Sequence, residues 1–223
     1  MDENYKVETE QTPETGKPEK KKKKSWKQEL REWIVALAVA LIVVFVIQTF
    51  FFRIIRVDGQ SMETTLHNGE RLFVNVAELR FTGRIDRGSI VICNYPNRYT
   101  NVLGIKFNTY FVKRLVGVPG DTVYRKDGVT HILYTDESGQ QVDNALDEDW
   151  TLNYAMLYPD LEAYTLGEDE YFVVGDNRYN SHDSRDWKGV GDNSNEVGPI
   201  SKRMIVGKVQ YIIWPLNSIR AAK

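Results

Sequence analysis

The chain has 223 residues, which suits one ordinary domain with appendages, and its formal net charge of −2 gives no case for a nucleic-acid partner. The single cysteine, Cys93, excludes an internal disulfide framework, and three widely spaced histidines without a CxxC motif argue against a zinc site. Because Cys93 lies in an apolar run, we interpret it as a small buried hydrophobic residue rather than a catalytic thiol.

The first 32 residues are almost entirely polar and charged. Such a segment cannot bury enough apolar surface to offset its conformational entropy, so we predict a disordered charged tail over residues 1–32. Between Lys17 and Arg31 the tail carries eight Lys and Arg residues against two glutamates. A lysine run alone would also fit a nucleic-acid or localisation patch, but this one directly precedes an apolar segment.

Residues 33–52 read WIVALAVALIVVFVIQTFFF, with Gln48 and Thr49 as the only polar side chains. As a helix this span is about 30 Å long and matches the hydrocarbon core of a bilayer. The Lys/Arg cluster before it predicts a cytoplasmic N-terminus, with residues 53–223 on the extracytoplasmic face of the cell membrane. A cleavable signal peptide is the alternative, but its apolar region is only about 7–15 residues and ends at small residues. Since RIIR follows here, we predict a retained single-pass transmembrane helix.

Residues 53–223 lack long amphipathic helical patterns and show short β-rich runs separated by Gly, Pro, Asn and Asp. The runs are Arg71–Val76, Ser89–Cys93, Tyr110–Val116, Thr122–Tyr124, Glu170–Val174 and Met204–Trp214. They predict a mainly β, antiparallel extracytoplasmic domain. Residues 135–168 are acidic and weakly patterned, and we expect them to form an insertion remote from the chemistry.

Ser61 is the first candidate for chemistry, because it follows Gly59 and precedes the apolar Met62. Glycine lets the backbone turn sharply and leave amides pointing at one spot, as an oxyanion hole requires. The G-x-S pattern occurs by chance in many chains, so this signal is weak on its own.

Lys113 lies in the apolar segment Tyr110–Val116. By strand alternation Phe111, Lys113 and Leu115 share one face. Arg114 points to the opposite face. A lysine on an apolar face has a lowered pKa, and its neutral amine can serve as the general base for a serine hydroxyl. An edge lysine that reaches solvent fits this segment equally well.

A third segment, residues 175–185, reads GDNRYNSHDSR and follows a strand-like run. Its side chains can form a polar network that holds a loop rigid, although the composition alone favours a solvated turn. A Ser–His–Asp triad of Ser61, His182 and either Asp183 or Asp176 is a further alternative. His182 and Asp183 are adjacent and would face opposite ways on an extended segment, so we do not expect a catalytic role for His182.

Together these segments resemble the type I signal peptidase family, and especially its Gram-positive, single-anchor branch, over most of residues 30–214. Four blocks occur in the family's order with similar spacing, which makes the resemblance specific. They are Gln60-Ser61-Met62, Asp86-Arg87-Gly88-Ser89-Ile90-Val91, Lys113-Arg114 with Gly117-Val118-Pro119-Gly120-Asp121, and Gly175-Asp176-Asn177-Arg178 with Ser181, Asp183, Ser184 and Arg185.

The resemblance implies a serine endopeptidase with a Ser/Lys dyad that removes N-terminal signal peptides from exported preproteins. Ser61 would be the acylating nucleophile, with its backbone amide as an oxyanion donor. Lys113 would be the general base, with Ser181 orienting its amine and Met62 packing against its stem. The family also implies shallow apolar pockets that select small side chains before the scissile bond, at the first and third positions.

Asp183 and Arg185 would form a structural ion pair beside the site, supported by Asp176 and Arg178. The resemblance implies no metal or organic cofactor. The expected partners are exported preproteins and the lipid bilayer, with the protein-translocation machinery as a further candidate and nucleic acid excluded.

The chain departs from the family pattern in three places. Many Gram-negative members have a serine at the position of Gly59, where its hydroxyl would join the oxyanion hole, so another donor must serve here. Thr64 replaces a usual proline, which loosens a turn without removing chemistry. The stretch Trp187–Glu196 is longer than usual, and we assign it no role.

Two other functions compete with this interpretation. A self-cleaving regulator with a Ser/Lys pair would carry a DNA-binding module in place of a membrane helix. A non-catalytic relative that assists pilus or adhesin assembly would not need both Ser61 and Lys113, and both are present.

Overall fold

The computed structural model describes residues 25–146, 160–187 and 197–222. Most of the predicted disordered tail and nearly all of the stretch Trp187–Glu196 lie outside these residues. The chain forms two compact units, Met1–Val43 and Val44–Lys223.

The apolar segment forms one helix, α1, over Trp26–Phe50. It is long and apolar enough to cross a membrane, and none of its residues is buried against protein. The helix begins before the predicted start at Trp33, because Lys, Gln, Glu, Leu and Arg all favour helix and continue it into the charged segment. It also ends earlier than predicted, since Phe52 is the first residue of a β-strand.

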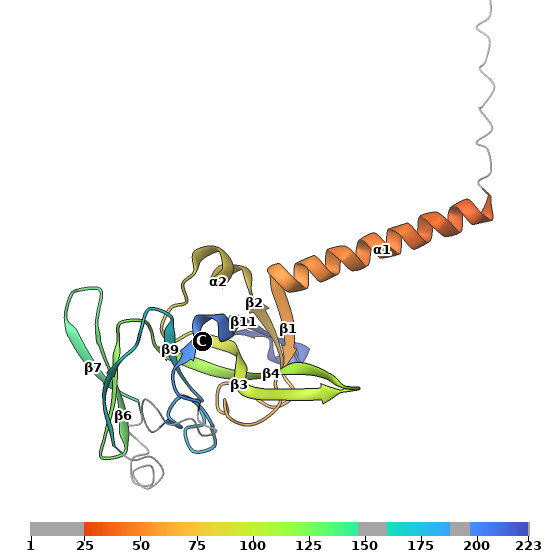
Figure 1. Cartoon of the computed structure of the whole chain (residues 1–223). Helices are drawn as coiled ribbons and strands as arrows, with labels where there is room; N and C mark the ends of the chain where they lie inside the picture. Colours follow the sequence, from red (N-terminus) through yellow and green to blue (C-terminus); the bar gives the residue numbers. More distant parts are fainter. Residues whose placement is uncertain (1–24, 147–159, 188–196, 223) are drawn as a thin grey trace, which may run out of the picture. The chain divides into compact units, whose positions relative to one another are not determined.

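The larger sheet is antiparallel throughout and places its strands in the order β1-β2-β11-β3-β4-β9-β10, with β12 paired to β11. Figure 1 shows β3 and β4 as a long pair that extends past the neighbouring strands. The bounds are β1 Phe52–Arg56, β2 Arg71–Asn75, β3 Ile90–Val102, β4 Ile105–Gly117, β9 Glu170–Val174, β10 Ile200–Ser201, β11 Ile205–Trp214 and β12 Arg220–Ala221.

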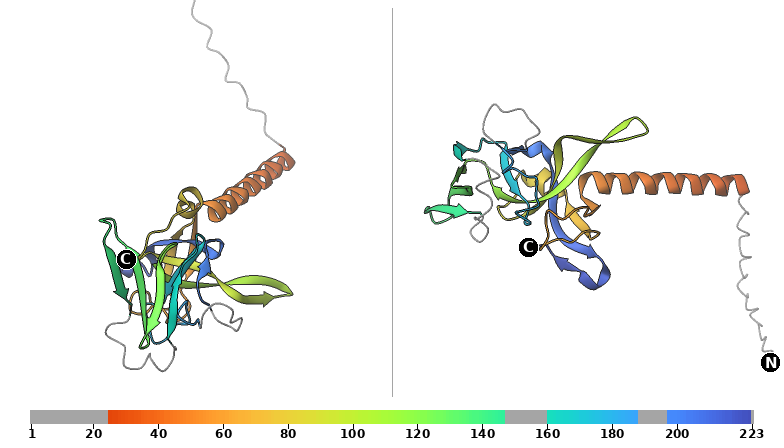
Figure 2. Two further views of the ribbon diagram at one scale, coloured as in Figure 1. Left: turned by 60° about the vertical axis from the view of Figure 1, so that its left-hand side comes forward. Right: turned by 90° about the horizontal axis from the view of Figure 1, so that it is seen from below.

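A second, four-stranded antiparallel sheet has the order β7-β6-β5-β8 and lies at the end of the domain away from β1 (Figures 1 and 2). Its bounds are β5 Thr122–Lys126, β6 Val129–Thr135, β7 Gln141–Ala145 and β8 Leu161–Thr165. The helical elements of the domain are α2 Ala77–Thr82, η1 Lys202–Met204 and η2 Leu216–Ser218. The predicted mainly β, antiparallel domain is confirmed.

The acidic segment 135–168 differs from the expected insertion remote from the chemistry. Where it is described it contributes β7 and β8, so the sheet pairs strands that the sequence pattern does not mark. The Leu146 carbonyl also accepts a hydrogen bond from Arg178, so this part of the segment is not remote from the candidate site. Residues 147–159 lie outside the described part of the chain.

The larger sheet buries side chains on both faces, because alternate residues of β3 belong to different core clusters. Ile90 and Ile92 pack with Met62 on one face. Val91 and Cys93 pack on the other. Cys93 is fully buried, as predicted, and burial raises the pKa of its thiol, so it is an inert core residue.

Candidate active site

Lys113 occupies the centre of β4, opposite Val91 of β3. Its side chain is only 3% exposed, and its neighbours on the same face, Phe111 and Leu115, are also buried. The predicted shared face is therefore confirmed. The Lys113 amine lies 5.5 Å from the centre of the Phe111 ring. Strand alternation has placed an ionisable amine in largely apolar surroundings.

The Lys113 amine donates a hydrogen bond to Ser61 Oγ at 2.6 Å. Burial lowers the pKa of Lys113 to about 8, and the Asp183 carboxylate opposes that shift in part. A substantial fraction of the amine is therefore neutral near pH 8, and a neutral amine at hydrogen-bond distance can take the proton of a hydroxyl.

The segment that carries Ser61 is fixed by backbone contacts with the turn after β9. The Asn177 N–H donates to the Ser61 carbonyl at 3.0 Å, and the Asn177 side-chain amide donates to the Gln60 carbonyl at 3.0 Å. Gly59 has a φ of 117°, which favours glycine, and its N–H donates to the Asn68 side chain at 3.2 Å. These contacts hold the hydroxyl of Ser61 against Lys113.

At Gly175 the turn after β9 and the Ser61 segment approach each other closely. A Cβ built at this position would overlap the Ser181 side chain and the Ser61 carbonyl oxygen. The Gly175 N–H donates to the Asp183 carboxylate at 2.8 Å. Glycine is therefore required here because a side chain would not fit. Its backbone conformation is not the reason, because the φ of Gly175 is outside the left-handed region.

Asp183 and Arg185 form a fully buried ion pair, with Arg185 Nε and Nη2 at 2.9 and 3.0 Å from the two carboxylate oxygens. Burial alone would raise the pKa of Asp183, but the Arg185 guanidinium and hydrogen bonds from Gly175 and Ser181 hold it below its usual value. The pair keeps the Asp183 carboxylate ionised near Lys113 and fixes the polypeptide around it.

Arg114, on the opposite face of β4 from Lys113, forms a two-pronged ion pair with Asp176 at 2.8 and 2.7 Å. Burial would raise the pKa of Asp176, but the pairing with Arg114 brings it below the usual value. The Asp176 N–H lies 3.4 Å from the sulfur of Met62. β4 is thus tied to the turn after β9 on this face too.

A model of the family described as signal peptidase, peptidase S26, matches residues 30–214 of this chain. The chain belongs to the peptidase S26 family. Relatives named signal peptidase I align over almost their whole length. "Signal peptidase I P" of Bacillus subtilis subsp. natto is 38% identical over 206 residues, which cover 91% of this chain and 98% of the relative.

Two other family members align to a similar extent. "Signal peptidase I" of Bacillus licheniformis is 37% identical over 198 residues, covering 87% of this chain and 94% of the relative. "Signal peptidase I T" of Bacillus subtilis strain 168 is 35% identical over 192 residues, covering 86% of this chain and 89% of the relative. The resemblance predicted from the four sequence blocks is confirmed.

Several expected contacts within the peptidase site differ in the structure. Ser181 Oγ donates to Asp183 at 2.6 Å, and no hydrogen bond joins it to Lys113 among the described residues. Asp176 pairs with Arg114 rather than with the Asp183–Arg185 pair. The reason is geometric: Asp176 follows the end of β9 at Val174, which lies opposite Arg114.

Arg178 and Met62 support the site in other ways. The Arg178 carbonyl accepts from Arg185 at 2.9 Å, and Arg178 Nε donates to the Gly175 carbonyl at 3.0 Å. Met62 is 2% exposed and belongs to the core cluster that includes Leu66. Both residues hold segments of the site in place through packing or backbone bonds.

His182 makes no hydrogen bond to Ser61 in the described part of the chain. Its Nδ1 pairs with the carboxylate of Asp186, four residues along the chain. The alternative Ser–His–Asp triad has no support in this geometry.

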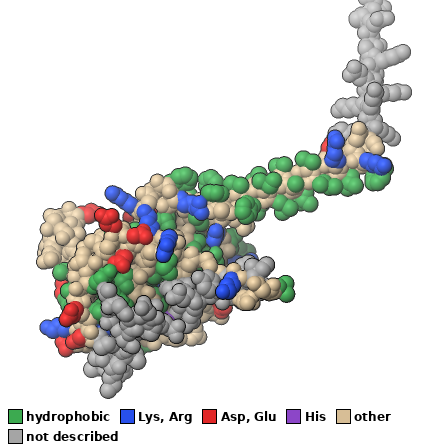
Figure 3. All heavy atoms as spheres, in the orientation of Figure 1, with side chains coloured by type: hydrophobic (Ala, Val, Ile, Leu, Met, Phe, Trp, Pro, Cys, Tyr) green, Lys and Arg blue, Asp and Glu red, His purple; other side chains and the backbone are tan. Residues whose placement is uncertain are grey.

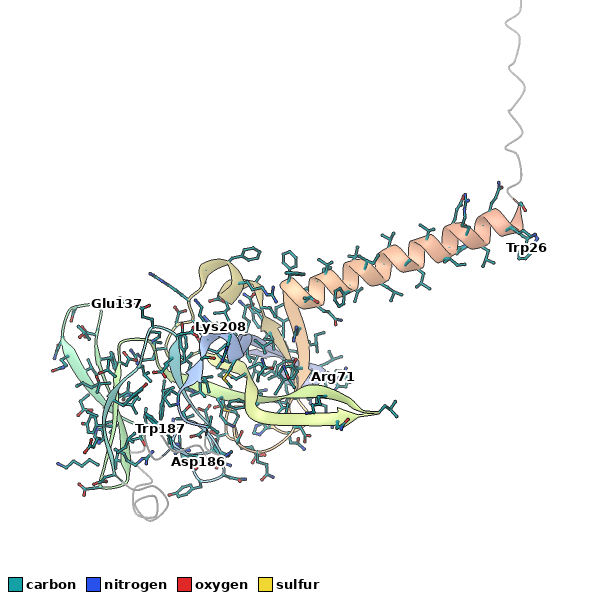
Figure 4. The ribbon with its side chains drawn as sticks, in the orientation of Figure 1. Trp26, Arg71, Glu137, Asp186, Trp187 and Lys208 are labelled. Atoms are coloured by element: carbon teal, nitrogen blue, oxygen red, sulfur yellow. The ribbon has the colours of Figure 1, made fainter. Side chains whose placement is uncertain are left out.

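Asp186 and Trp187 are labelled in Figure 4. The Trp187 ring packs edge-on against the Tyr164 ring, with ring centres 4.9 Å apart.

Sequence reasoning missed the clamp between Glu70 and Arg220. Arg220 bonds the two Glu70 carboxylate oxygens at 2.8 and 3.1 Å and the Thr65 carbonyl at 2.9 Å. Burial would raise the pKa of Glu70, but the Arg220 bond brings it below its usual value.

Sequence reasoning also missed Asn177 and Gly175 as residues that position Ser61, since their contacts depend on tertiary structure. The only signal was their place in the last family block.

Proposed function

We propose that this chain is a membrane-anchored serine endopeptidase that removes N-terminal signal peptides from exported preproteins, with Ser61 as nucleophile and Lys113 as general base. The single observation that carries the proposal is the 2.6 Å contact between the Lys113 amine and Ser61 Oγ, with a lysine that is almost fully buried. The names of the Bacillus relatives support the same activity.

In the proposed reaction, neutral Lys113 takes the proton of Ser61 as Oγ attacks the carbonyl carbon of the scissile peptide bond. The resulting lysine ammonium gives this proton to the leaving amine, the C–N bond breaks, and the signal peptide remains as an ester on Ser61. Lys113 then activates a water molecule, which hydrolyses the ester and restores both side chains.

The Ser61 N–H is the proposed oxyanion donor, because it donates no hydrogen bond to any residue in the described part of the chain. Gly59 offers no side-chain hydroxyl for a second donor, and a Cβ built there has no atom within 4 Å. The loss of one oxyanion donor typically lowers kcat by a factor of about 10²–10³. A second backbone amide or a water molecule must therefore take this role.

The proposed topology places residues 1–32 in the cytoplasm, residues 33–52 in the cell membrane and the peptidase domain outside. The Lys/Arg cluster that precedes the apolar span 33–52 supports this orientation. The preprotein would lie as an extended strand along an edge of the enzyme's β-structure, with small side chains facing shallow pockets. Two partners confined to one bilayer meet at high effective concentration, so weak affinity suffices. The protein-translocation machinery is a proposed further partner.

The proposal is tested by preprotein cleavage in detergent with full-length wild type, Ser61→Ala and Lys113→Met. We expect both variants to lose nearly all activity, whereas Lys126→Met, which removes an exposed lysine, retains it. Full activity in Lys113→Met would overturn the proposed base. No cleavage by wild type, with a folded chain, would favour the inactive relative, and cleavage only of its own chain would favour the self-cleaving regulator.

A further inference from the structure

A pocket of about 250 Å³ lies on the larger sheet where α2 and η1 cover it. Three arginines from three separate elements line it: Arg53 of β1, Arg80 of α2 and Arg203 of η1. Figure 3 shows Lys and Arg side chains over the part of the domain that carries α2. Three guanidinium groups around one small pocket make a site for an anion.

No carboxylate neutralises these three arginines within the described residues. Four other arginines of the domain, by contrast, each lie against an acidic side chain: Arg87 on Asp121, Arg114 on Asp176, Arg185 on Asp183 and Arg220 on Glu70. The acidic residue of α2, Glu78, is instead engaged by Lys208 and Asn75. The pocket therefore keeps its positive charge.

The contacts that these arginines do make hold them in place without cancelling their charge. Arg53 donates to the Gln48 carbonyl at 3.1 Å and to the Tyr110 hydroxyl at 3.2 Å. The Arg80 guanidinium lies 4.8 Å from the centre of the Phe50 ring. Each group retains N–H donors for a ligand, because a guanidinium has five.

The place of the pocket in the chain indicates where the anion comes from. Phe50 is the last residue of α1, and Arg53 follows it by three positions, so chain connectivity keeps Arg53 at the membrane surface when α1 spans a bilayer. Exposed apolar side chains lie around it: Phe51 is 48%, Ile54 58% and Phe81 76% exposed. Apolar and aromatic side chains at such a position enter the headgroup region, where arginines meet lipid phosphates.

We propose that this pocket binds the phosphodiester headgroup of an anionic glycerophospholipid. Asn94, which also lines the pocket, has a buried amide oxygen that accepts no hydrogen bond from any described residue. Rotation of this amide toward the pocket would break no bond to that oxygen, and a headgroup hydroxyl such as that of phosphatidylglycerol would satisfy it. The bound lipid would fix the first strand and α2 at the bilayer surface.

The test is lipid binding by the full-length protein in neutral detergent, measured as retained lipid in native mass spectrometry and as the rise in unfolding temperature. The probes are phosphatidylglycerol, phosphatidylcholine and soluble sn-glycerol 3-phosphate. The variant is Arg80→Gln with Arg203→Gln, which removes two exposed charges from the pocket. The matched control is Arg84→Gln with Lys126→Gln, which removes two exposed charges that do not line it.

We expect wild type and the control to retain phosphatidylglycerol in preference to phosphatidylcholine, and the pocket variant to lose this preference. Without a built site, each removed charge would weaken binding by the same factor of about five, so equal losses in the two double variants would overturn the proposal. If sn-glycerol 3-phosphate at the same concentration raised the unfolding temperature as much as phosphatidylglycerol does, the proposal that the bound phosphate belongs to a lipid would be overturned. Neither readout depends on Ser61 or Lys113, so the proposed peptidase activity can fail or hold independently.

Discussion

The Lys113 amine lies 2.6 Å from Ser61 Oγ, although 52 positions separate the two residues in the chain. β4, an interior strand of the larger sheet, carries Lys113, and the turn after β9 holds the Ser61 backbone against it. Burial removes water from the charged amine of a lysine and so disfavours its protonated form. Here burial lowers the pKa of Lys113 to about 8. The same burial therefore has consequences for stability and for catalysis.

Lys113→Met is expected to stabilise the fold while it removes activity. The pKa of Lys113 falls from 10.5 to about 8 on folding, which corresponds to a cost of about 3 kcal/mol at pH 7, offset by about 1 kcal/mol for the Ser61 hydrogen bond. A net gain of about 2 kcal/mol follows for the methionine variant. The check is the unfolding free energy of the full-length protein in detergent, with Lys126→Met as the exposed-lysine control.

The pH dependence of that gain has a definite sign. Between about 8 and 10.5 the unfolded chain binds more protons at Lys113 than the folded chain, so wild-type stability rises with pH across this window. The advantage of Lys113→Met should therefore be full below about pH 8 and shrink above it. A variant less stable than wild type at pH 7 would contradict the burial cost.

Gly175→Ala should reduce turnover by about 10²-fold or more, because a methyl group there displaces Ser61 or Ser181 by a substantial fraction of an ångström. Gly167→Ala is the control, since its Cβ would meet only Glu170 at ordinary contact distances. Preprotein cleavage under single-turnover conditions measures the effect. Unchanged turnover in Gly175→Ala would mean that the close approach does not position Ser61.

Asp183→Ala should destabilise the protein by about 3–5 kcal/mol, because it leaves the guanidinium of Arg185 buried without its carboxylate. The double replacement of Asp183 and Arg185 should cost less than the sum of the single ones. Lys208→Ala, which breaks two partly exposed ion pairs, should change stability by about 1 kcal/mol or less. Additive losses at Asp183 and Arg185 would contradict the coupling.

Acid should weaken the Asp183 contribution. The folded pKa of Asp183 lies below its unfolded value, so its stabilising effect is present above the ordinary carboxyl range and is lost as pH falls through the folded pKa. Acid unfolding of wild type compared with Asp183→Asn measures the contribution of the Asp183 carboxylate to stability. An identical acid midpoint and slope in the two proteins would contradict it.

Local patterns predicted those features that depend on local geometry. The shared face of Phe111, Lys113 and Leu115 and the bounds of β9 follow from strand alternation and from turn residues, and the structure confirms both. The first residue of α1 was not predictable from hydropathy, because charged residues such as Lys27 also favour helix.

Features that depend on long-range pairing were not predictable. Polar residues beyond Cys93 continue β3 because β4 supplies their backbone partners, and β7 and β8 form in an acidic segment for the same reason. The partners of Ser181 and Asp176 depend on which side chains the sheet brings together, and the sequence resemblance named the residues without fixing those contacts.

Single-turnover cleavage of a preprotein by the full-length enzyme, followed as a function of pH, tests most directly whether Lys113 is the base for Ser61. We predict a rate that rises with pH through a midpoint near about 8 and then levels off, as the amine loses its proton, with no cleavage by Lys113→Met at any pH. The result that would contradict the dyad is a midpoint of about 6.5, in the ordinary histidine range, that persists in Lys113→Met. His182 would then be the next base to test.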